Sequence, residues 1–395
     1  MDGHSEYQKA WQRFRRNRPA VAGLWFVAAA MFIALFGYVL APDHSPDANA
    51  QIPEISLQPP GFRVMILPVK LINEAHKSSW FTVLWHGQAL TYKPIPIELS
   101  SLKVEGDSVH FQYFGKNSRL GNVHLVQLYY SIQDSVLIVG DDYVFQNSAG
   151  NAARISRSLL LKNMKEASVL QTRTFPLGTD KYGRCILSRL MLGFRISLLV
   201  GLIAVVISLS IGIVIGAVGG YFGGRVDDFV MLVVNTVWSI PTLLLVFAVV
   251  LALGRGIGII FLAVGLTMWV DVARLVRGQV LAVKQLAFVE AAKSMGLGHR
   301  RILLRHILPN LLGPVMVVAA GNFATAILVE SGLSYLGFGV QPPAPSWGTM
   351  LNENYGYALG GKPLLALAPA LAIAFTVLAF NLVGNGLRDA LDVRQ

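Results

Sequence analysis

Long apolar stretches separated by polar segments set the architecture of this chain. A helix needs about 20 apolar residues to cross a bilayer. Stretches of that length recur at 20–41, 196–220, 229–254, 256–277, 311–333 and 364–387. The pattern predicts an all-α polytopic membrane protein with six transmembrane helices. Pro241 removes a backbone donor from the third of them, so we expect a kink there.

The region between the first two spans has a different pattern. Short runs of β-branched and aromatic residues alternate with Gly, Pro, Asn and Asp, which is typical of strands and turns. These runs lie at 62–72, 80–87, 109–115 and 124–140. We predict a β-rich inserted domain over 43–172, between a basic N-terminus with the first span (1–42) and a helical core (173–395).

Large apolar residues indicate that the insert is a folded domain and not a linker. In a disordered chain such side chains would be poorly solvated. They include Trp80, Trp85, Phe111, Tyr113 and Tyr130.

The distribution of basic residues predicts the orientation in the membrane. Lys and Arg cluster in the first 19 residues and in the loop 272–306, whereas the short loops on the opposite face carry only Arg255 and Lys362. Basic loops stay in the cytoplasm. We therefore expect both termini and the 272–306 loop to be cytoplasmic, and the insert to lie on the other side.

Composition and motifs exclude several function classes. The chain is 54% hydrophobic and 14% charged with a net charge of +11, which we attribute to cytoplasmic Lys and Arg near lipid and not to nucleic-acid binding. The single cysteine, Cys185, excludes an intrachain disulfide framework. His299 and His306 lack further ligands for a metal. The stretch 356–363 ends in Pro363 where a phosphate-binding loop needs Ser or Thr. We predict no catalytic centre, metal or cofactor in this chain.

The most distinctive segment is "EAAKSMGLGHRRILLRHILPN", residues 290–310. A helix is expected over 286–295, followed by a turn at Gly296 and Gly298 and by a second helix that bends at Pro309 as it enters the membrane. One face of the first helix carries Phe288, Ala291, Ala292 and Met295. The pattern alone leaves two interpretations open. The segment is either a surface that a partner pushes or an ordinary solvated basic loop.

This segment resembles the EAA loop of importer-type ABC transporter permeases. The resemblance rests on Glu-Ala-Ala, on a Gly four residues after the second Ala, and on a later His-x-Leu-Pro. It implies that the coupling positions toward an ATPase are Glu290, Ala291, Ala292, Gly296, His306 and Pro309.

Other stretches resemble the C-type permease subunit of the dipeptide/oligopeptide/nickel importers. They are "RFRRNRPAVAGLWFV", "PLGTDKYGRCILSRLMLGFRISLLVGL", "GGYFGGRVDDFVM", "IPTLLLV", "ESGLSYLGFGVQPPAPSWGTML" and "GNGLRDALDVRQ". The second contains the family signature, on Gly178, Thr179, Asp180, Gly183, Arg184, Arg195 and Ser197. Departures are Cys185 and Asn385, where the family usually has Asp, and Val393, where it has Pro. The insert has no counterpart in this resemblance.

The resemblance implies a five-helix permease core preceded by an extra first span, in a bacterial inner membrane. The expected partners are a second related permease in a heterodimer, two cytoplasmic ATPase subunits that hold ATP and Mg, and an extracytoplasmic substrate-binding protein. The expected substrates are di- or oligopeptides. Alternatives are nickel or another small solute and, from a different class, a membrane receptor with the insert as its sensor.

Two polar residues lie inside the fifth span. Intramembrane carboxylates are costly and usually face a cavity or a partner. Asn322 and Glu330 are therefore candidates for lining the translocation path, with a structural bond to a neighbouring helix as the alternative.

Overall fold

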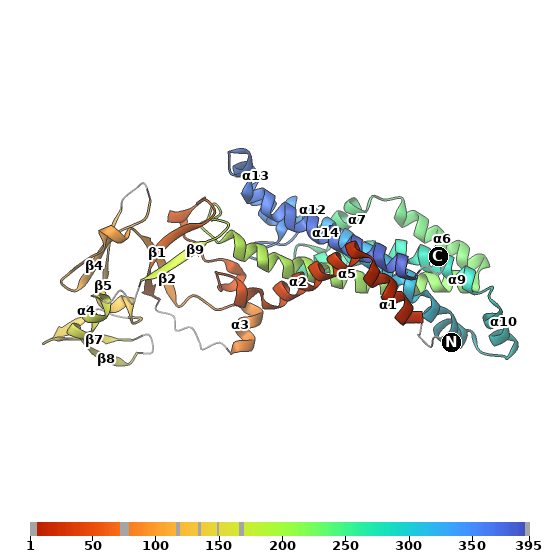
Figure 1. Cartoon of the computed structure of the whole chain (residues 1–395), viewed down its shortest axis with the longest axis horizontal. Helices are drawn as coiled ribbons and strands as arrows, with labels where there is room; N and C mark the ends of the chain where they lie inside the picture. The colour runs from red at the N-terminus through yellow and green to blue at the C-terminus, as the bar shows by residue number, and fades with distance from the viewer. Residues whose placement is uncertain are drawn as a thin grey trace. The chain divides into compact units, whose positions relative to one another are not determined.

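The computed structural model describes residues 6–71, 79–115, 119–132, 136–147, 150–165 and 170–391. The chain divides into two compact units. One consists of residues 1–35 and 193–395 and contains the membrane helices, and the other is 36–192 (Figure 1). Val393, one of the departures from the family pattern, lies outside the described residues.

The membrane unit is built from long apolar helices. They are α2 (Arg18–Leu40), α5 (Ile186–Phe222), α6 (Gly224–Trp238), α7 (Thr242–Leu253), α8 (Ile257–Thr267), α9 (Trp269–Val283), α12 (Leu312–Tyr335) and α14 (Leu364–Leu391). Within the described residues, five helical segments are long and apolar enough to cross a membrane, and α6 with α7 makes a sixth if the pair is one span. The six predicted spans are confirmed on that reading.

The third span is broken and not merely kinked. Helix α6 ends at Trp238 and α7 starts at Thr242, with an angle of 87° between them. Pro241 precedes the first residue of α7, and its carbonyl accepts the backbone N–H of Leu245 at 3.1 Å. Because proline has no N–H to donate to the preceding turn, the α6 ladder stops and a new helix begins.

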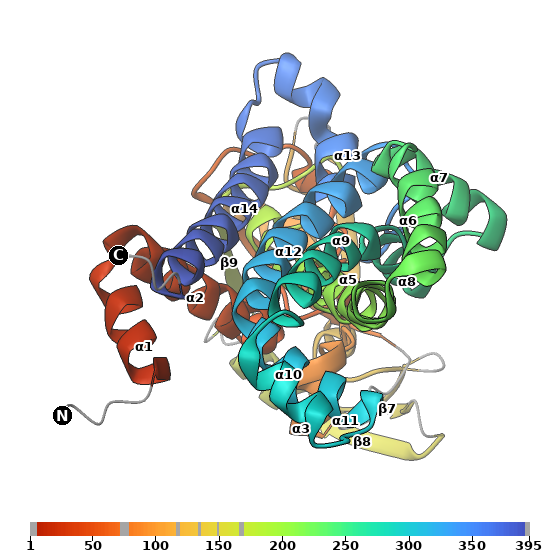
Figure 2. The same cartoon turned by 90° about the vertical axis from the view of Figure 1, so that its right-hand side faces the viewer.

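Small residues let the membrane helices approach closely. A Cβ at Gly386 would lie 2.2 Å from the Cβ of Ala20, where α14 packs on the start of α2. A Cβ at Gly216 would lie 2.3 Å from the carbonyl oxygen of Ala273, where α5 crosses α9. Close backbone contact through small residues is a common packing mode in membranes, where the lipid is as apolar as the side chains. Figure 2 shows α12 and α14 lying next to each other.

The insert is β-rich, as predicted. Its described part forms three antiparallel sheets, each of three strands, in the orders β2-β1-β9, β3-β4-β5 and β6-β7-β8. The strands are β1 (Phe62–Lys70), β2 (Tyr92–Ile97), β3 (Lys103–Glu105), β4 (Ser108–Gln112), β5 (Leu120–His124), β6 (Leu137–Val139), β7 (Asp142–Gln146), β8 (Ala152–Ser156) and β9 (Gln171–Phe175). Pairing of β1 with β9 joins the two ends of the insert, since Phe62 lies opposite Phe175.

Of the predicted strand runs, 80–87 is wrong and 124–140 is right only in part. Residues 80–87 form the helix α3 (Trp80–His86), which ends at Gly87, and the run 124–140 opens with a 3₁₀ helix (Leu125–Leu128) before β6. Short apolar runs have no periodicity that separates a strand from a buried helical turn. A second helix, α4 (Arg157–Lys165), follows β8.

The core of the insert contains fewer of the predicted aromatic residues than expected. Phe111 is buried beside Tyr143 and Phe145, and Tyr113 packs against the same cluster. Trp80 and Trp85, in contrast, are exposed on α3. The core therefore consists mainly of aliphatic residues from β1, β2 and the 3₁₀ helix, and the tryptophans need another explanation.

We expect the insert to lose stability on acidification through His124. The ring packs edge-on against Tyr143, and its Nδ1 accepts the backbone N–H of Val126 at 3.3 Å. Burial lowers the pKa of His124 below 6.5, and the charge of Asp107 opposes this only partly. The unfolded chain thus takes up a proton first, so this contribution is complete above about pH 6.5 and declines as the pH falls below it.

The measurement is the urea concentration at which the insert is half unfolded. It is monitored by amide hydrogen exchange in the full-length chain, at about pH 7.5 and about pH 5.5. His124→Asn keeps an acceptor for the Val126 N–H but cannot titrate. We expect the variant to lose much less stability between the two pH values than the wild type. Equal losses in both proteins would contradict the assignment.

Candidate coupling site

The basic segment folds as a short helix with two defined ends. Helix α10 spans Ala287–Ser294 and stops at Gly296, whose φ is +73°. The N–H of Gly296 donates to the carbonyl of Lys293 at 2.9 Å, and the N–H of Leu297 donates to that of Ala292 at 3.2 Å. These two bonds form a Schellman motif, which favours glycine at the left-handed position. The predicted helix and turn are both confirmed.

One side of α10 is anchored and the other is free. Val289 and Ala292 are buried in a cluster that also contains Val276 and Val280 of α9 and Ile302 and Ile307 beyond the turn. Glu290 and Ala291 are exposed, as are Phe288 (42%) and Met295 (71%). The four residues predicted to share one face are therefore divided between two sides of the helix. Ala292 is buried, whereas Phe288, Ala291 and Met295 are exposed.

The chain after the turn leads into the membrane without a break. Helix α11 (His299–Arg301) continues as a π-helix (Ile302–Ile307), a 3₁₀ turn (Leu308–Leu311) and then α12. Pro309 lies in the 3₁₀ turn and cannot donate to the preceding turn, so the helix changes its winding there. The carbonyl of His306 accepts the side-chain amide of Asn310 at 2.6 Å. The predicted bend at Pro309 is thus a local change of winding.

The end of α5 is attached to this segment through Tyr221. Its hydroxyl lies 2.9 Å from Nδ1 of His299, and the two rings meet edge to face. Lys284, which follows α9, donates from Nζ to the backbone carbonyl of Tyr221 at 2.5 Å. Nearby, Arg277 of α9 forms a two-pronged ion pair with Asp227 of α6. The segment thus contacts α5, α9 and α12, and Figure 2 shows α10 and α11 side by side.

No sequence pattern indicates the contacts made by Tyr221, Lys284 and the Asp227–Arg277 pair. Their partners lie between 50 and 78 residues away in the chain. Lys284 and Arg277 registered only as positive charge, and nothing in the sequence pairs Tyr221 with His299.

We expect Tyr221→Phe to weaken coupling without unfolding the protein. The substitution removes the hydroxyl that bonds His299 but keeps the ring contact. One hydrogen bond contributes about 1 kcal/mol, which corresponds to roughly a fivefold change in an equilibrium. Substrate-stimulated ATPase activity of the reconstituted complex should fall by about that factor. The matched control is Tyr357→Phe on α13 (Trp347–Leu359), and equal effects of the two variants would contradict the prediction.

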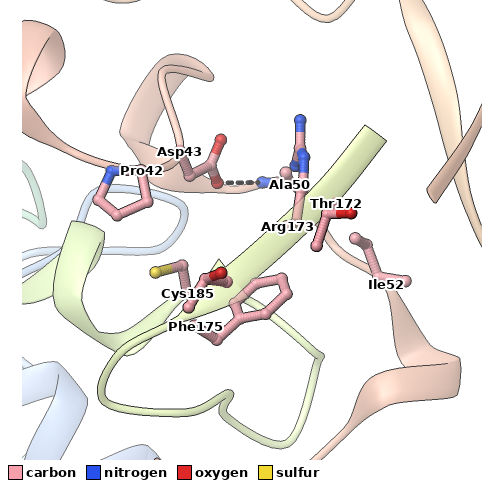
Figure 3. A pocket seen from close by; sticks show the side chains of 9 residues that line it. Pro42, Asp43, Ala50, Ile52, Thr172, Arg173, Phe175 and Cys185 are labelled. Atoms are coloured by element: carbon pink, nitrogen blue, oxygen red, sulfur yellow. Dashed lines mark hydrogen bonds between the residues drawn. The ribbon is translucent and has the colours of Figure 1, made fainter. Parts of the chain in front are cut away.

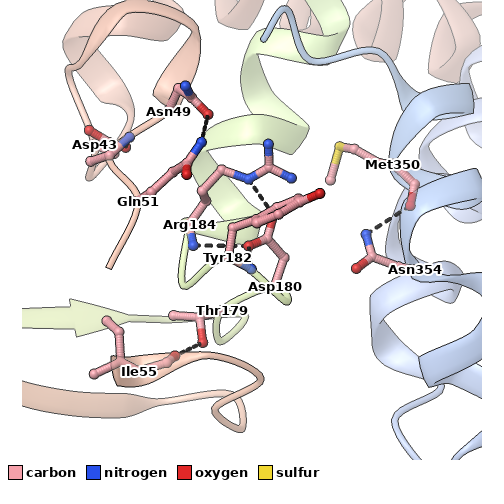
Figure 4. Close-up of polar contacts among 11 residues, drawn as sticks. Asp43, Asn49, Gln51, Ile55, Thr179, Asp180, Tyr182, Arg184, Met350 and Asn354 are labelled. Carbon is pink, nitrogen blue, oxygen red and sulfur yellow. Dashed lines mark hydrogen bonds and ion pairs between the residues drawn. The ribbon is translucent and has the colours of Figure 1, made fainter. Parts of the chain in front are cut away.

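The family-signature residues form a separate structural site, within the unit 36–192. Asp180 accepts the backbone N–H groups of Tyr182 and Arg184 with Oδ1 and binds Nε of Arg184 with Oδ2 at 2.6 Å (Figure 4). The pair is almost completely buried. Arg184 also stacks over the ring of Tyr182, with 4.5 Å from the guanidinium carbon to the ring centroid.

This signature turn holds the segment that follows the first span. The hydroxyl of Thr179 donates to the carbonyl of Ile55 and accepts the N–H of Gln58 at 2.9 Å. Gly178 (φ +80°) and Gly183 (φ +73°) lie against the same segment, and a Cβ at Gly183 would be 1.8 Å from the carbonyl oxygen of Ile52. The compact unit therefore includes the signature turn, which we had assigned to the helical core.

The other two signature residues lie elsewhere. Arg195 and Ser197 are on α5 within the membrane unit, and Ser197 is completely buried. The structure thus brings five of the seven predicted signature residues into one turn.

Cys185 lies at the edge of a small cavity beside the signature turn (Figure 3). The cavity measures about 170 Å³, and its lining includes Asp43 and Arg173. Asp43 accepts the backbone N–H groups of Ser45 and Ala50 at 3.0 and 3.2 Å. Burial raises the pKa of the Cys185 thiol, so the group is expected to be unreactive.

Asn322 and Glu330 are both buried in α12. The amide of Asn322 donates to the carbonyl of Met268 at 3.4 Å, and Glu330 accepts the hydroxyls of Ser334 and Ser331 at 2.7 and 3.4 Å. These contacts agree with the structural alternative, and a role in the translocation path stays a prediction.

Comparison with known proteins adds the family. Residues 192–395 match the family described as binding-protein-dependent transport system inner membrane component, and residues 5–60 match the N-terminal transmembrane domain of oligopeptide transport permease C. The chain is 48% identical over 215 residues to the glutathione transport system permease protein GsiD of Shigella flexneri serotype 5b, covering 54% of this chain and 71% of the relative. It is 39% identical over 235 residues to the dipeptide transport system permease protein DppC of Bacillus subtilis, covering 60% and 73%.

Among solved structures, a chain of the MetNI methionine ABC transporter in inward-facing conformations is similar over 50% of this chain and 91% of its own. The TM-score is 0.40 and the identity 19%. The family model covers residues 192–395, which contain most of α5 and all of the membrane helices from α6 to α14. This chain belongs to the family of inner-membrane components of binding-protein-dependent transport systems, and it is the permease subunit of an ABC importer.

Proposed function

We propose that this permease conducts short peptides and is driven by ATPase subunits that bind α10. The observation that carries the proposal is the two-sided construction of α10. Val289 and Ala292 fix one side to the membrane helices, while Glu290, Ala291 and Met295 are exposed on the other. A short helix fixed on one side and free on the other suits transmission of force from a partner. The peptide substrate class is supported by the relatives, whose names specify glutathione and dipeptides.

The proposed partners follow from the same construction. Two cytoplasmic ATPase subunits hold ATP and Mg. They bind α10 of this chain and the corresponding helix of a second, related permease. A binding protein on the opposite side delivers the peptide. This chain supplies no catalytic group or cofactor, and its coupling residues are Glu290, Ala291, Ala292 and Gly296, with His306 and Pro309 in the connection to α12.

The mechanism uses the attachments of the segment. When ATP draws the ATPase subunits together, α10 moves with them. Because α10 packs on α9 and α11 bonds to Tyr221 at the end of α5, the displacement reaches several membrane helices at once. The bundle then exchanges between outward-open and inward-open states, and ATP shifts the balance because its binding differs between them.

Transport of peptides by the reconstituted complex tests the function. We expect this subunit to co-purify with ATPases and a second permease, and vesicles with the binding protein to take up glutathione or dipeptides in an ATP-dependent manner. Uptake of Ni²⁺ but not of peptides would move the substrate to the nickel branch. Purification without any ATPase, together with a signalling protein, would favour the receptor alternative.

The orientation is a separate proposal, supported by the basic residues around α10 and α11. In a Cys185→Ala background, a cysteine introduced at the exposed Arg300 should be protected from membrane-impermeant thiol reagents in intact cells. A cysteine at the exposed Glu105 of β3 should react once the outer membrane is permeable. The reverse pattern would invert the topology.

A further inference from the structure

Helix α3 of the insert presents an aromatic face to solvent. Trp80, Phe81 and Trp85 are 67%, 63% and 40% exposed, and the rings of Phe81 and Trp85 lie 6.3 Å apart. Leu84 is buried, whereas Trp80, Phe81 and Trp85 leave much of their surface exposed. A contiguous patch of large apolar side chains on a surface usually marks an interaction site.

The position of this helix identifies the partner. Gly87, which ends α3 with φ +75°, lies so close to the first span that a Cβ would come within 2.8 Å of the ring of Tyr38. Tyr38 is in the last turn of α2. The next residue, Gln88, donates its backbone N–H to the carbonyl of His44 at 2.7 Å, and the ring of His44 bonds the carbonyl of Tyr38 at 2.6 Å. Within the unit 36–192, α3 is therefore fixed at the level where a membrane span ends.

The composition of α3 fits that level. Its sequence WFTVLWH contains two tryptophans and no Lys, Arg, Asp or Glu. Tryptophan is enriched at membrane–water interfaces, where the ring contacts lipid chains and the indole N–H stays near water. Seven residues make a helix of about 10 Å, far too short to span a bilayer but sufficient to lie at its surface.

We propose that Trp80, Phe81 and Trp85 insert into the boundary between lipid headgroups and acyl chains, in the leaflet where the first span ends. The insert is thereby held on the bilayer surface by two points, the end of α2 and the face of α3. A binding protein or a second permease is less suited to cover these side chains. Tyr38 lies where the first span leaves the membrane, so the bilayer surface is already next to α3.

Depth-dependent quenching tests this in the full-length chain, reconstituted with its partner subunits in lipid nanodiscs. In the Cys185→Ala background, an environment-sensitive probe is attached to a cysteine at Thr82, which is exposed on α3, or at Glu105, which is exposed on β3. We expect the probe at position 82 to be quenched by lipids that carry a nitroxide near the headgroup, more than by lipids with the nitroxide near the chain end. The probe at 105 should respond to neither.

Serine replacements provide the matched comparison. Replacing Trp80, Phe81 and Trp85 together should reduce quenching at position 82 to the level seen at 105, with an unchanged unfolding temperature, because Leu84 still anchors the helix. Replacing Leu137, Ile138 and Val139, which are equally apolar and exposed on β6, should leave quenching at 82 unchanged. The proposal is overturned if position 82 is not quenched, if it becomes shielded only when the binding protein is added, or if the first triple variant retains full quenching.

Discussion

Replacing Gly296 by proline will abolish peptide uptake while leaving the protein in the membrane. Proline holds φ near −65°, whereas Gly296 has φ +73°. It also lacks the N–H that donates to the carbonyl of Lys293. The Schellman turn cannot form, so α10 loses its defined end and its position on Val276 and Val280. The membrane helices do not depend on this turn, so insertion and assembly with the second permease should persist.

The acidic residue of the same helix gives a second route to the same outcome. Glu290 is exposed in this chain and, by the proposed function, becomes enclosed at the ATPase contact. Reversing a charge inside an interface places like charges together, which costs several kcal/mol. Glu290→Arg should therefore reduce coupling by roughly a hundredfold, since each factor of ten corresponds to about 1.4 kcal/mol.

The measurement is uptake and binding-protein-stimulated ATPase activity, side by side in reconstituted vesicles. Gly298→Ala is the control for the glycine, because Gly298 has φ −66° and an alanine meets no neighbour within 4 Å among the described residues. Glu105→Arg on β3 is the control for the charge. Normal transport by both Gly296→Pro and Glu290→Arg would show that residues 290–296 are an ordinary solvated loop.

Gly183→Ala will open the signature turn and expose Cys185. A Cβ at this position would lie 1.8 Å from the carbonyl oxygen of Ile52, a backbone atom that cannot turn aside. The left-handed conformation costs a non-glycine residue about 1–2 kcal/mol, and overpacking costs about 1–3 kcal/mol more. The segment after the first span should therefore detach from the turn far more often than in the wild type.

Thiol labelling reports this opening directly, because Cys185 is buried in the cluster that contains Ile52 and Ile55. Its labelling rate should rise by about a hundredfold, given 1.4 kcal/mol for each factor of ten. Gly61→Ala separates the two causes. Gly61 has a similar φ of +77°, but its Cβ would meet nothing within 4 Å in the described part of the chain. A labelling rate in Gly183→Ala no higher than in Gly61→Ala would rule out the steric explanation.

The sequence predicts the membrane helices well and the insert only in outline. Long apolar stretches leave no choice but helices, because a bilayer cannot solvate an unpaired backbone. The run 80–87 offers no such constraint. Its aromatic residues suit a strand, yet Gly87 ends a helix there because the chain must pass close to Tyr38. That contact depends on a partner 49 residues away in the chain, so no local pattern reveals it.

The sequence predicts the coupling segment less completely than the membrane helices but better than the insert. The Glu-Ala-Ala and Gly296 pattern predicts the helix and its end, since both are coded locally. Which side is buried depends on Val276 and Val280 of α9 and on Ile302, and these come together only in the folded bundle. The sequence therefore locates the site, while Tyr221 and the division of the predicted face emerge only from the tertiary structure.

The two fixed ends of α10 also set its rotational phase. Leu286, in extended conformation, begins the helix, and Gly296 stops it eight helical residues later. Each residue of an α-helix advances the direction of its side chains by roughly 100°. One residue added or removed between Leu286 and Glu290 would turn the Glu290 side chain by roughly 100° relative to the start of the helix, even if every remaining side chain were kept. The length of this segment is therefore as much a part of the coupling element as its composition, and a change in register is a more severe lesion than most substitutions within it.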